Sequence, residues 1–205
     1  MRTYKRVEIR NMTKKEIIWR HILNDFLEGQ QIFTQKALAQ KFSFSLSTIF
    51  NALKIPRASG AIEVSGRNFR VRDFEKFLLF WATVRNLDKA IIYYTHTDTP
   101  MRKAEGIMPP NVIFAAFSAY RLKYQDPPAD YDKIYVYTNE IKEIEKRFPK
   151  KKGYPNLFVL KEDAHLASFG KTTPDVQTFV DIWNLKEWYA KDFLAALKQK
   201  MKISV

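Results

Sequence analysis

The stretch Thr34–Arg72, TQKALAQKFSFSLSTIFNALKIPRASGAIEVSGRNFRVR, decides the fold of the first part of the chain. Its apolar residues recur at helical spacing behind Thr34, whose hydroxyl can accept a hydrogen bond from an amide of the first turn. Ser45 can cap a second helix in the same way, and we expect Pro56 to end that helix because proline has no amide hydrogen. The pattern therefore predicts two short helices joined by a tight turn.

Two extended runs, 61–65 and 69–72, follow these helices. Gly66-Arg67-Asn68 lies between them and has the residue types of a hairpin turn. Upstream, Thr13 and Glu16 have the spacing of a capping box, which predicts another helix before the pair. Three helices and a hairpin in this order predict a winged helix-turn-helix.

The last of the three helices is expected to present a polar face away from the core. Ile49 and Leu53 are four residues apart and face inward, which leaves polar residues on the opposite side. On this helix we expect DNA contacts from Ser45, Ser47, Thr48, Asn51 and Lys54. On the hairpin we expect them, chiefly to phosphates, from Arg67, Asn68, Arg70 and Arg72. The alternative is a winged helix that binds only protein, with solvated arginines.

The distribution of charge agrees with a polyanionic partner. The chain has 205 residues, 46% of them hydrophobic, and a net charge of +13. Residues 1–73 hold 14 Lys and Arg against 6 Asp and Glu, whereas the remaining 132 residues hold 21 against 16. The excess of positive charge is thus concentrated in the segment whose pattern already suggests DNA binding.

Several classes of protein are excluded or disfavoured by the sequence. The chain has no cysteine, which excludes disulfides, thiolate chemistry and zinc fingers with Cys ligands. No apolar run approaches the roughly 18 residues that a membrane span needs, and the N-terminal residues lack the hydrophobic centre of a signal peptide. We therefore expect a cytoplasmic protein without a membrane partner.

From residue 74 onward, helical and extended runs alternate. Strands are predicted at 89–94, 133–138 and 156–160, and helices at 111–122, 140–148, 174–185 and 186–201. Residues 98–110 are expected to be irregular because they contain three prolines and a glycine. The order predicts an α+β chain: a winged helix-turn-helix over 1–73, a connecting helix over 74–88 and a small α/β domain with C-terminal helices over 89–205.

Chemically active patterns are sparse. His21, His96 and His165 are isolated, and we expect His21 to be packed against the core rather than bound to metal. The glycines form neither a phosphate-binding loop nor a dinucleotide fingerprint, and there is no serine elbow. We therefore expect no enzyme activity, no metal and no cofactor.

Two alternative functions use the second half of the chain. A metal-dependent nuclease would draw on acidic residues beside predicted strands, with Asp132 and Glu162 as the first candidates and Asp130 and Asp163 near them. A ligand-sensing regulator would use the helix over 111–122 to line a pocket. Four tyrosines at 93, 94, 135 and 137 suit either a stacking platform for single-stranded nucleic acid or an ordinary half-buried sheet.

The segment TPDVQTFVDIW at 173–183, with the helix after it, resembles the P-x-Q-x-Y-x-D-L helix and final helix of the AbiEi antitoxins of type IV toxin–antitoxin systems. Phe179 stands where that family often has tyrosine. The predicted winged helix is the other part of the likeness. The resemblance implies an autorepressor that binds inverted repeats in its own promoter, with two copies on the DNA.

The same resemblance implies that the second domain neutralises a nucleotidyltransferase-like toxin without forming a stable complex with it. Gln177 and Asp181 are four residues apart on one face of this helix, which makes them a candidate polar site. The alternative is a helical turn tied to the loop above it. The function expected from all these observations is a sequence-specific DNA-binding transcriptional repressor.

Overall fold

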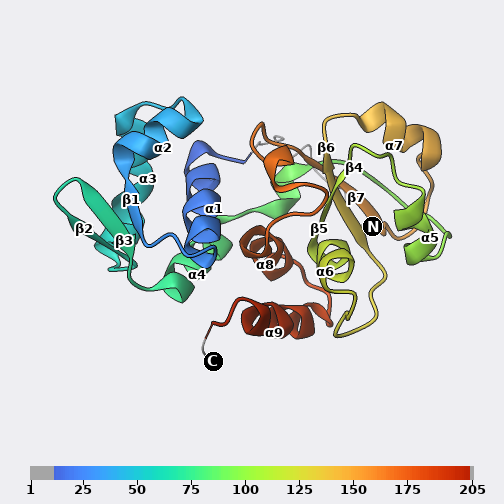
Figure 1. Cartoon of the computed structure of the whole chain (residues 1–205). Coiled ribbons are helices and arrows are strands. Elements are labelled where there is room, and N and C mark those ends of the chain that lie inside the picture. Colours follow the sequence, from blue (N-terminus) through green and yellow to red (C-terminus); the bar gives the residue numbers. More distant parts are fainter. Residues whose placement is uncertain (1–11, 204–205) are drawn as a thin grey trace.

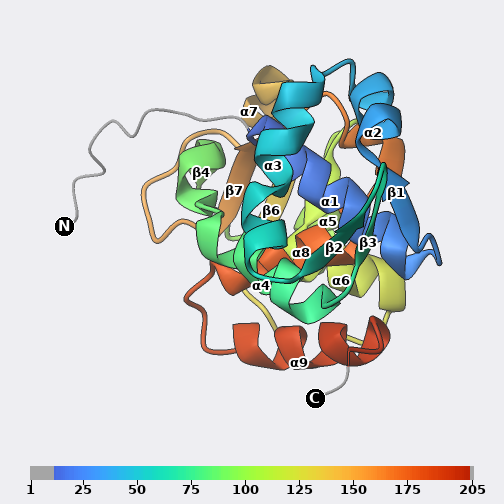
Figure 2. The ribbon, with the colours of Figure 1, turned by 90° about the vertical axis from the view of Figure 1, so that its left-hand side faces the viewer.

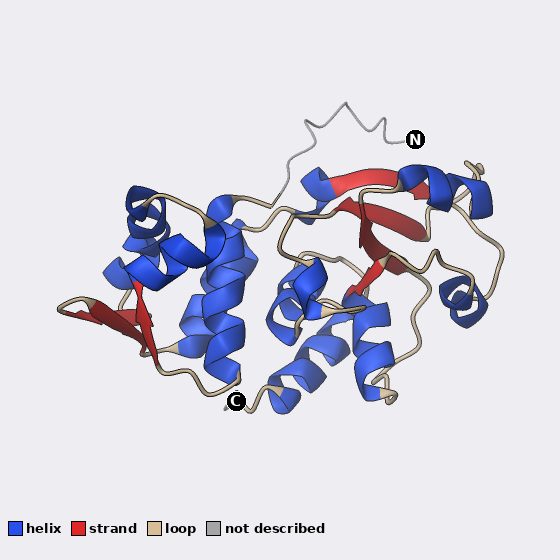
Figure 3. Cartoon of the chain, turned by 45° about the horizontal axis from the view of Figure 1, so that its top comes forward, coloured by secondary structure: helices blue, strands red, loops and turns tan. Residues whose placement is uncertain are grey.

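The structure, a computed structural model, describes residues 12–203, so the basic lead-in expected before Met12 lies outside the described residues. It is a mixed α+β fold with two small sheets. Several helices lie between the sheets, and two short helices lie on the outer side of the second sheet (Figures 1 and 3). Within residues 12–203, no helix combines the length and apolarity needed to cross a membrane.

The first sheet belongs to the N-terminal part of the chain, at the left in Figure 1. It is antiparallel with strand order β1-β3-β2, so the first strand pairs with the last. Strand β1, only three residues long, was not predicted from the sequence. The elements of this part are α1 (Lys14–Leu27), β1 (Ile32–Thr34), α2 (Gln35–Phe42), α3 (Leu46–Ala58), β2 (Ile62–Ser65) and β3 (Asn68–Val71).

Each helix of this part begins at the predicted cap. Thr13 and Glu16 form the capping box of α1, with the Thr13 amide donating to Glu16 Oε2 at 3.0 Å. The Thr34 hydroxyl accepts from the Ala37 amide at 3.0 Å at the start of α2. Ser45 Oγ accepts from the Thr48 amide at 3.2 Å at the start of α3. These local signals were sufficient because a cap involves residues only three positions apart.

Pro56 does not end α3, contrary to the expectation, and lies inside its last turn. A proline there removes the amide that would donate to the carbonyl four residues earlier, which is that of Ala52. The indole Nε1 of Trp19 donates to the Ala52 carbonyl at 2.7 Å instead. The fully buried Trp19 thus joins α1 to α3 at the position where the helix lacks its own bond.

The hairpin turn is one residue shorter than predicted. Ser65 pairs with Asn68, so the turn consists of Gly66 and Arg67 alone. Gly66 has φ of +60°, a left-handed conformation that glycine adopts at little cost and that two-residue hairpin turns require.

The second sheet has the order β4-β7-β6-β5, with β6 parallel to β7 and the other pairs antiparallel. Its side chains alternate, so Ile134 and Val136 of β6 face α5 and α7, whereas Tyr135 and Tyr137 face α6, α8 and α9. The elements are α4 (Phe74–Val84), η1 (Leu87–Ala90), β4 (Ile91–Thr95), α5 (Met101–Gly106), β5 (Ile113–Ala115), α6 (Ala116–Tyr124), β6 (Ile134–Thr138), α7 (Ile141–Arg147), β7 (Leu157–Lys161), η2 (Ala167–Phe169), α8 (Asp175–Trp183) and α9 (Ala190–Lys200).

Two expectations for this part were wrong. The segment 98–110 contains helix α5, and the helix expected from Asn111 is preceded by the short strand β5. The chain passes from β5 into α6 through Ala116, whose φ of +49° is left-handed and has no signature in the sequence. The three predicted strands and the last two helices are present, with ends shifted by up to four residues.

Helix α1 occupies the centre of the molecule. Its residues from Glu16 to Leu23 are all buried, because one side packs on α3 and the other packs on α4 and α8. One cluster of buried apolar side chains accordingly runs from Ile18 in α1 through Trp81 in α4 to Phe179 in α8 and Phe193 in α9. The two sheets are therefore connected by a continuous core.

Replacing Trp19 by Phe is expected to lower the free energy of unfolding by about 2 kcal/mol, because the buried Ala52 carbonyl loses its donor. In a Pro56→Ala background the same change is expected to cost about 1 kcal/mol less, since Ala at 56 restores the helical amide. Urea denaturation of the native chain, both single variants and the double variant measures this coupling. Equal costs in the two backgrounds would contradict the assignment.

Candidate nucleic-acid interface

Helix α3 lies at the front of the view in Figure 2, and its buried and exposed residues alternate as its periodicity predicted. Ile49 and Leu53 are buried, whereas Ser47, Asn51 and Lys54 are exposed along the opposite side. These three side chains are three or four residues apart and therefore lie in one row. The row offers a hydroxyl, an amide and an ammonium group, which suit hydrogen bonding to base edges and phosphates.

The hydroxyls of Ser45, Ser47 and Thr48 lie together at the start of α3. Ser45 Oγ lies 2.9 Å from Thr48 Oγ1 and 2.9 Å from Ser47 Oγ, while also accepting the Thr48 amide. Their hydroxyls are therefore engaged in the cap of α3. A hydroxyl can rotate to a new partner, but Ser45 serves first to begin the helix.

Sequence reasoning missed an apolar flank beside the polar row. Phe50 is 46% exposed, and Leu46, one turn earlier, is 56% exposed. Lys54 Nζ lies 5.4 Å from the centre of the Phe50 ring, which holds the ammonium group beside the polar row. Leu46 and Phe50 lie outside the buried stripe of the helix, and this spacing was the sequence signal for the apolar flank. Apolar side chains in such a position can contact the methyl group of thymine.

The three hairpin arginines do not form one cluster. Arg67 lies in the turn, whereas Arg72 follows the far end of β3. Arg70 lies between them and pairs across the hairpin with Glu63 at 2.8 Å. The hydrogen bond and charge of Arg70 lower the pKa of Glu63 below its usual value. Asn68 is exposed at the start of β3, beside Arg67.

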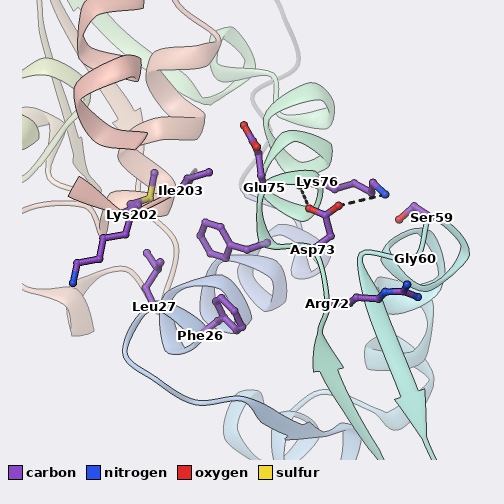
Figure 4. A pocket seen from close by; sticks show the side chains of 12 residues that line it. Phe26, Leu27, Ser59, Gly60, Arg72, Asp73, Glu75, Lys76, Lys202 and Ile203 are labelled. Carbon is purple, nitrogen blue, oxygen red and sulfur yellow. Dashed lines mark hydrogen bonds and ion pairs between the residues drawn. The ribbon is translucent and has the colours of Figure 1, made fainter. Parts of the chain in front are cut away.

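Arg72 lines a cavity of about 640 Å³ between the end of α1, the start of α4 and the segment after α9 (Figure 4). Asp73 caps α4 by accepting from the Lys76 amide at 2.9 Å, and Glu75 pairs with Lys198 at 2.5 Å. The acidic groups of the cavity thus already have partners. Arg72 thus lines this cavity, at the end of β3 away from Arg67.

Gln177 and Asp181, the other predicted polar residues, are fully buried in α8. Gln177 Oε1 accepts from Arg20 Nη1 at 2.9 Å, and the same guanidinium donates to both oxygens of Asp163 at 2.7 and 2.8 Å. Arg20 comes from α1 and is only 1% exposed. The hydrogen bond between Arg20 and Gln177 thus joins α1 to α8, two helices from opposite ends of the chain.

Asp181 belongs to a second buried group in contact with the first. Tyr137 of β6 donates to Asp181 at 2.9 Å and accepts from Arg85 at 2.9 Å. Arg85 also lies 3.5 Å from Glu16 of α1. Burial raises the pKa of Asp181 to about 6, although Arg85 nearby acts to lower it. We call Glu16, Arg20, Arg85, Tyr137, Asp163, Gln177 and Asp181 the polar seam.

Two of the three histidines pack against α2, near the polar seam. The rings of His21 and His165 contact Phe42 from edge-on positions, at 5.2 and 5.0 Å between centres. Burial, and then the charges of Lys41 and Arg20, lower the pKa of His21 to about 4. The expected packing of His21 is confirmed by its burial and by its contact with Phe42.

The acidic residues proposed for a nuclease do not meet. Asp132 precedes β6 and Glu162 follows β7, and these strands are parallel. A five-residue strand is about 16 Å long, so the two carboxylates lie at opposite ends of these strands. Asp132 accepts instead from the Tyr189 hydroxyl at 2.6 Å. Residues 12–203 contain no group of three His, Cys, Asp or Glu side chains placed to hold a metal ion.

Comparison of the chain with protein-family models, with curated proteins and with solved structures gave no match.

Changing Asp163 to Asn is expected to lower the free energy of unfolding by about 3–5 kcal/mol, because it leaves the buried charge of Arg20 without a counter-ion. Burial acts to raise the pKa of Asp163, but Arg20 holds it below its usual value. The native chain should therefore lose this part of its free energy of unfolding as the pH falls from about 4 through the lowered pKa of Asp163. The variant has no carboxyl group at position 163 and should not show that loss.

Urea denaturation at neutral pH and along an acid series measures both effects. The matched control is Glu63→Gln in the exposed pair with Arg70, which should change stability by less than about 1 kcal/mol. Similar costs for the two variants at neutral pH would count against a structural role of the polar seam.

Proposed function

We propose that this protein is a cytoplasmic, sequence-specific DNA-binding transcriptional repressor that reads its operator with α3. The observation that carries the proposal is the exposed row of Ser47, Asn51 and Lys54 beside a hairpin with Arg67 in its turn. The order helix, strand, helix, helix, strand, strand, with the sheet order β1-β3-β2, is the arrangement expected of a winged helix. In such domains the last helix of the three lies in the major groove.

The charge of the chain supports the same proposal. Positive charge is concentrated in residues 1–73. Part of it is neutralised within the fold, because Arg20 is buried against Asp163 and Arg70 pairs with Glu63. Lys54 and Arg67 remain exposed, without an ion pair among residues 12–203, on the face that would meet DNA. They are therefore the cations of this face best placed to displace counter-ions from DNA.

We extend the proposal to an antitoxin-like autorepressor that acts on inverted repeats in its own promoter and is paired in function with a nucleotidyltransferase-like toxin. Its basis is the resemblance of residues 173–183 to the AbiEi helix. Gln177 and Asp181 of that segment lie within the polar seam. In this proposal they hold α8 in place, and any contact with a toxin involves other residues.

A gel-shift experiment tests the proposal most directly. The purified protein is titrated into its own upstream DNA and into a random duplex of equal length, at two salt concentrations. A repressor of its own gene should prefer the upstream fragment, and this preference should persist at the higher salt, since base contacts are less sensitive to salt than phosphate contacts. Equal, salt-sensitive binding to both fragments would refute it.

Asn51→Ala is expected to weaken binding to the cognate operator by about 1–3 kcal/mol while leaving binding to random duplex nearly unchanged. The reason is that an asparagine on the exposed row can bond adenine through two hydrogen bonds, which random sequence rarely offers at that position. Fluorescence anisotropy with both duplexes measures the difference. A loss of equal size on both would show that Asn51 does not read bases.

Arg67→Ala is expected to reduce the slope of log K against log salt by about 1, because one phosphate contact is lost. Arg70→Ala is the matched control, since Arg70 is already paired with Glu63 and should change the slope less. Binding is measured over a range of salt concentrations for both variants. A larger change for Arg70 than for Arg67 would show that the hairpin breaks its internal pair on DNA.

A further inference from the structure

A pocket of about 250 Å³ opens on the second sheet, away from α3. Its floor is formed by Ile91 of β4, Tyr135 of β6 and Phe158 of β7, which lie on the sheet face that α8 and α9 cover only in part. The connection between α8 and α9, residues 184–187, forms one wall. The volume is below the range typical of drug-sized ligands, so the pocket suits a molecule the size of one ring system.

Aromatic rings give the pocket flat surfaces. The rings of Tyr135 and Phe158 are stacked, with centres 4.8 Å apart and planes inclined by 10°. Tyr154 lies at the rim and is 71% exposed, and its hydroxyl contacts Lys133 Nζ at 3.1 Å. Lys133 Nζ also lies 4.9 Å from the centre of the Tyr154 ring, so a ligand beside Lys133 would also meet this ring. Such surfaces favour a planar ligand, since stacked rings bind each other beyond the effect of their buried area.

Two polar groups in the pocket make no hydrogen bond to any group of residues 12–203, and one of them, Glu187 Oε2, is fully buried. The Glu187 side chain is nine-tenths buried and pairs with Lys133 through Oε1, but Oε2 has no partner among residues 12–203. The Tyr135 hydroxyl, in a side chain only 4% exposed, also makes no hydrogen bond within these residues. Unsatisfied buried groups cost free energy, so a ligand that hydrogen-bonds them gains more than one that does not.

The charges of the pocket decide what kind of ligand fits. Lys133 and Lys186 balance Asp88 and Glu187, so a neutral ligand meets no excess of either sign. The free Oε2 of Glu187 calls for a hydrogen-bond donor. Lys133 uses two of its three hydrogens on Glu187 and Tyr154, which leaves one for an acceptor on the ligand. An anion would be repelled by Asp88 and the free oxygen, and a purely apolar ligand would leave both groups unsatisfied.

We propose that this pocket binds a neutral planar heterocycle with an amino group next to a ring nitrogen, as in an aminopurine. The amino group donates to Glu187 Oε2, the adjacent ring nitrogen accepts from Lys133, and the Tyr135 hydroxyl bonds a further ring nitrogen. Tyr154 covers the outer face of the ring. The inference uses none of the residues proposed to contact DNA, so it stands or fails separately from the proposed repressor.

Isothermal titration calorimetry with adenine tests this site on the full chain. Purine has the same rings without the amino group, and hypoxanthine has an oxo group in its place. Adenine is expected to bind with a dissociation constant between micromolar and millimolar, as its small size allows, and each analogue at least about tenfold more weakly. Absence of binding at millimolar adenine, or equal binding of adenine and purine, would overturn the proposal.

Two variants locate the binding. Tyr135→Phe removes only a hydroxyl that makes no hydrogen bond within residues 12–203, so it should fold normally and yet bind adenine about tenfold more weakly. Glu187→Gln should show a similar loss. The matched control is Tyr120→Phe, which removes the hydroxyl of another buried tyrosine that makes no hydrogen bond within residues 12–203. Tyr120 lies outside the pocket, so this variant should bind adenine as the native chain does. Native affinity in both pocket variants would place any binding elsewhere and refute the site.

Discussion

The structure depends on a guanidinium group that has almost no contact with water. Arg20 lies in the middle of α1, and its charge could not be buried without a carboxylate to meet it. That carboxylate, Asp163, is 143 residues away in the sequence. The first and last thirds of the chain must therefore fold against each other before α1 can be buried on both sides. The face of α3 is fixed in turn, because α3 rests on the opposite side of the same helix.

Local features of the fold could be predicted, whereas features that depend on distant residues could not. Thr13, Thr34 and Ser45 begin helices because each cap is complete within three residues. Pro56 was misjudged because its missing hydrogen bond is replaced by Trp19, which lies in another helix. The left-handed Ala116 carries no signal at all, since alanine there suggests an uninterrupted helix. Gln177 and Asp181 were expected to form a polar pair, but their partners Arg20 and Tyr137 were not predicted, because they lie in distant elements as Trp19 does.

One residue in the hairpin turn decided how well the candidate DNA face could be predicted. A three-residue turn over 66–68 would set Glu63 opposite Val71, whereas the two-residue turn sets it opposite Arg70. Because side chains alternate along a strand, this shift of one position determines which residues share a face. The ion pair that occupies Arg70 follows from the true register. By contrast, the face of α3 was predicted correctly because helical periodicity depends on no distant partner.

Helix α8 connects the candidate regions of the molecule. Near its start, Gln177 lies against Arg20 of α1, and beyond its end, residues 184–187 form a wall of the small pocket. Asn184, where the helix ends, also donates to the Ala82 carbonyl of α4 at 3.1 Å. The pocket wall and α1, on which α3 packs, are therefore connected through α8 by a continuous series of packed elements.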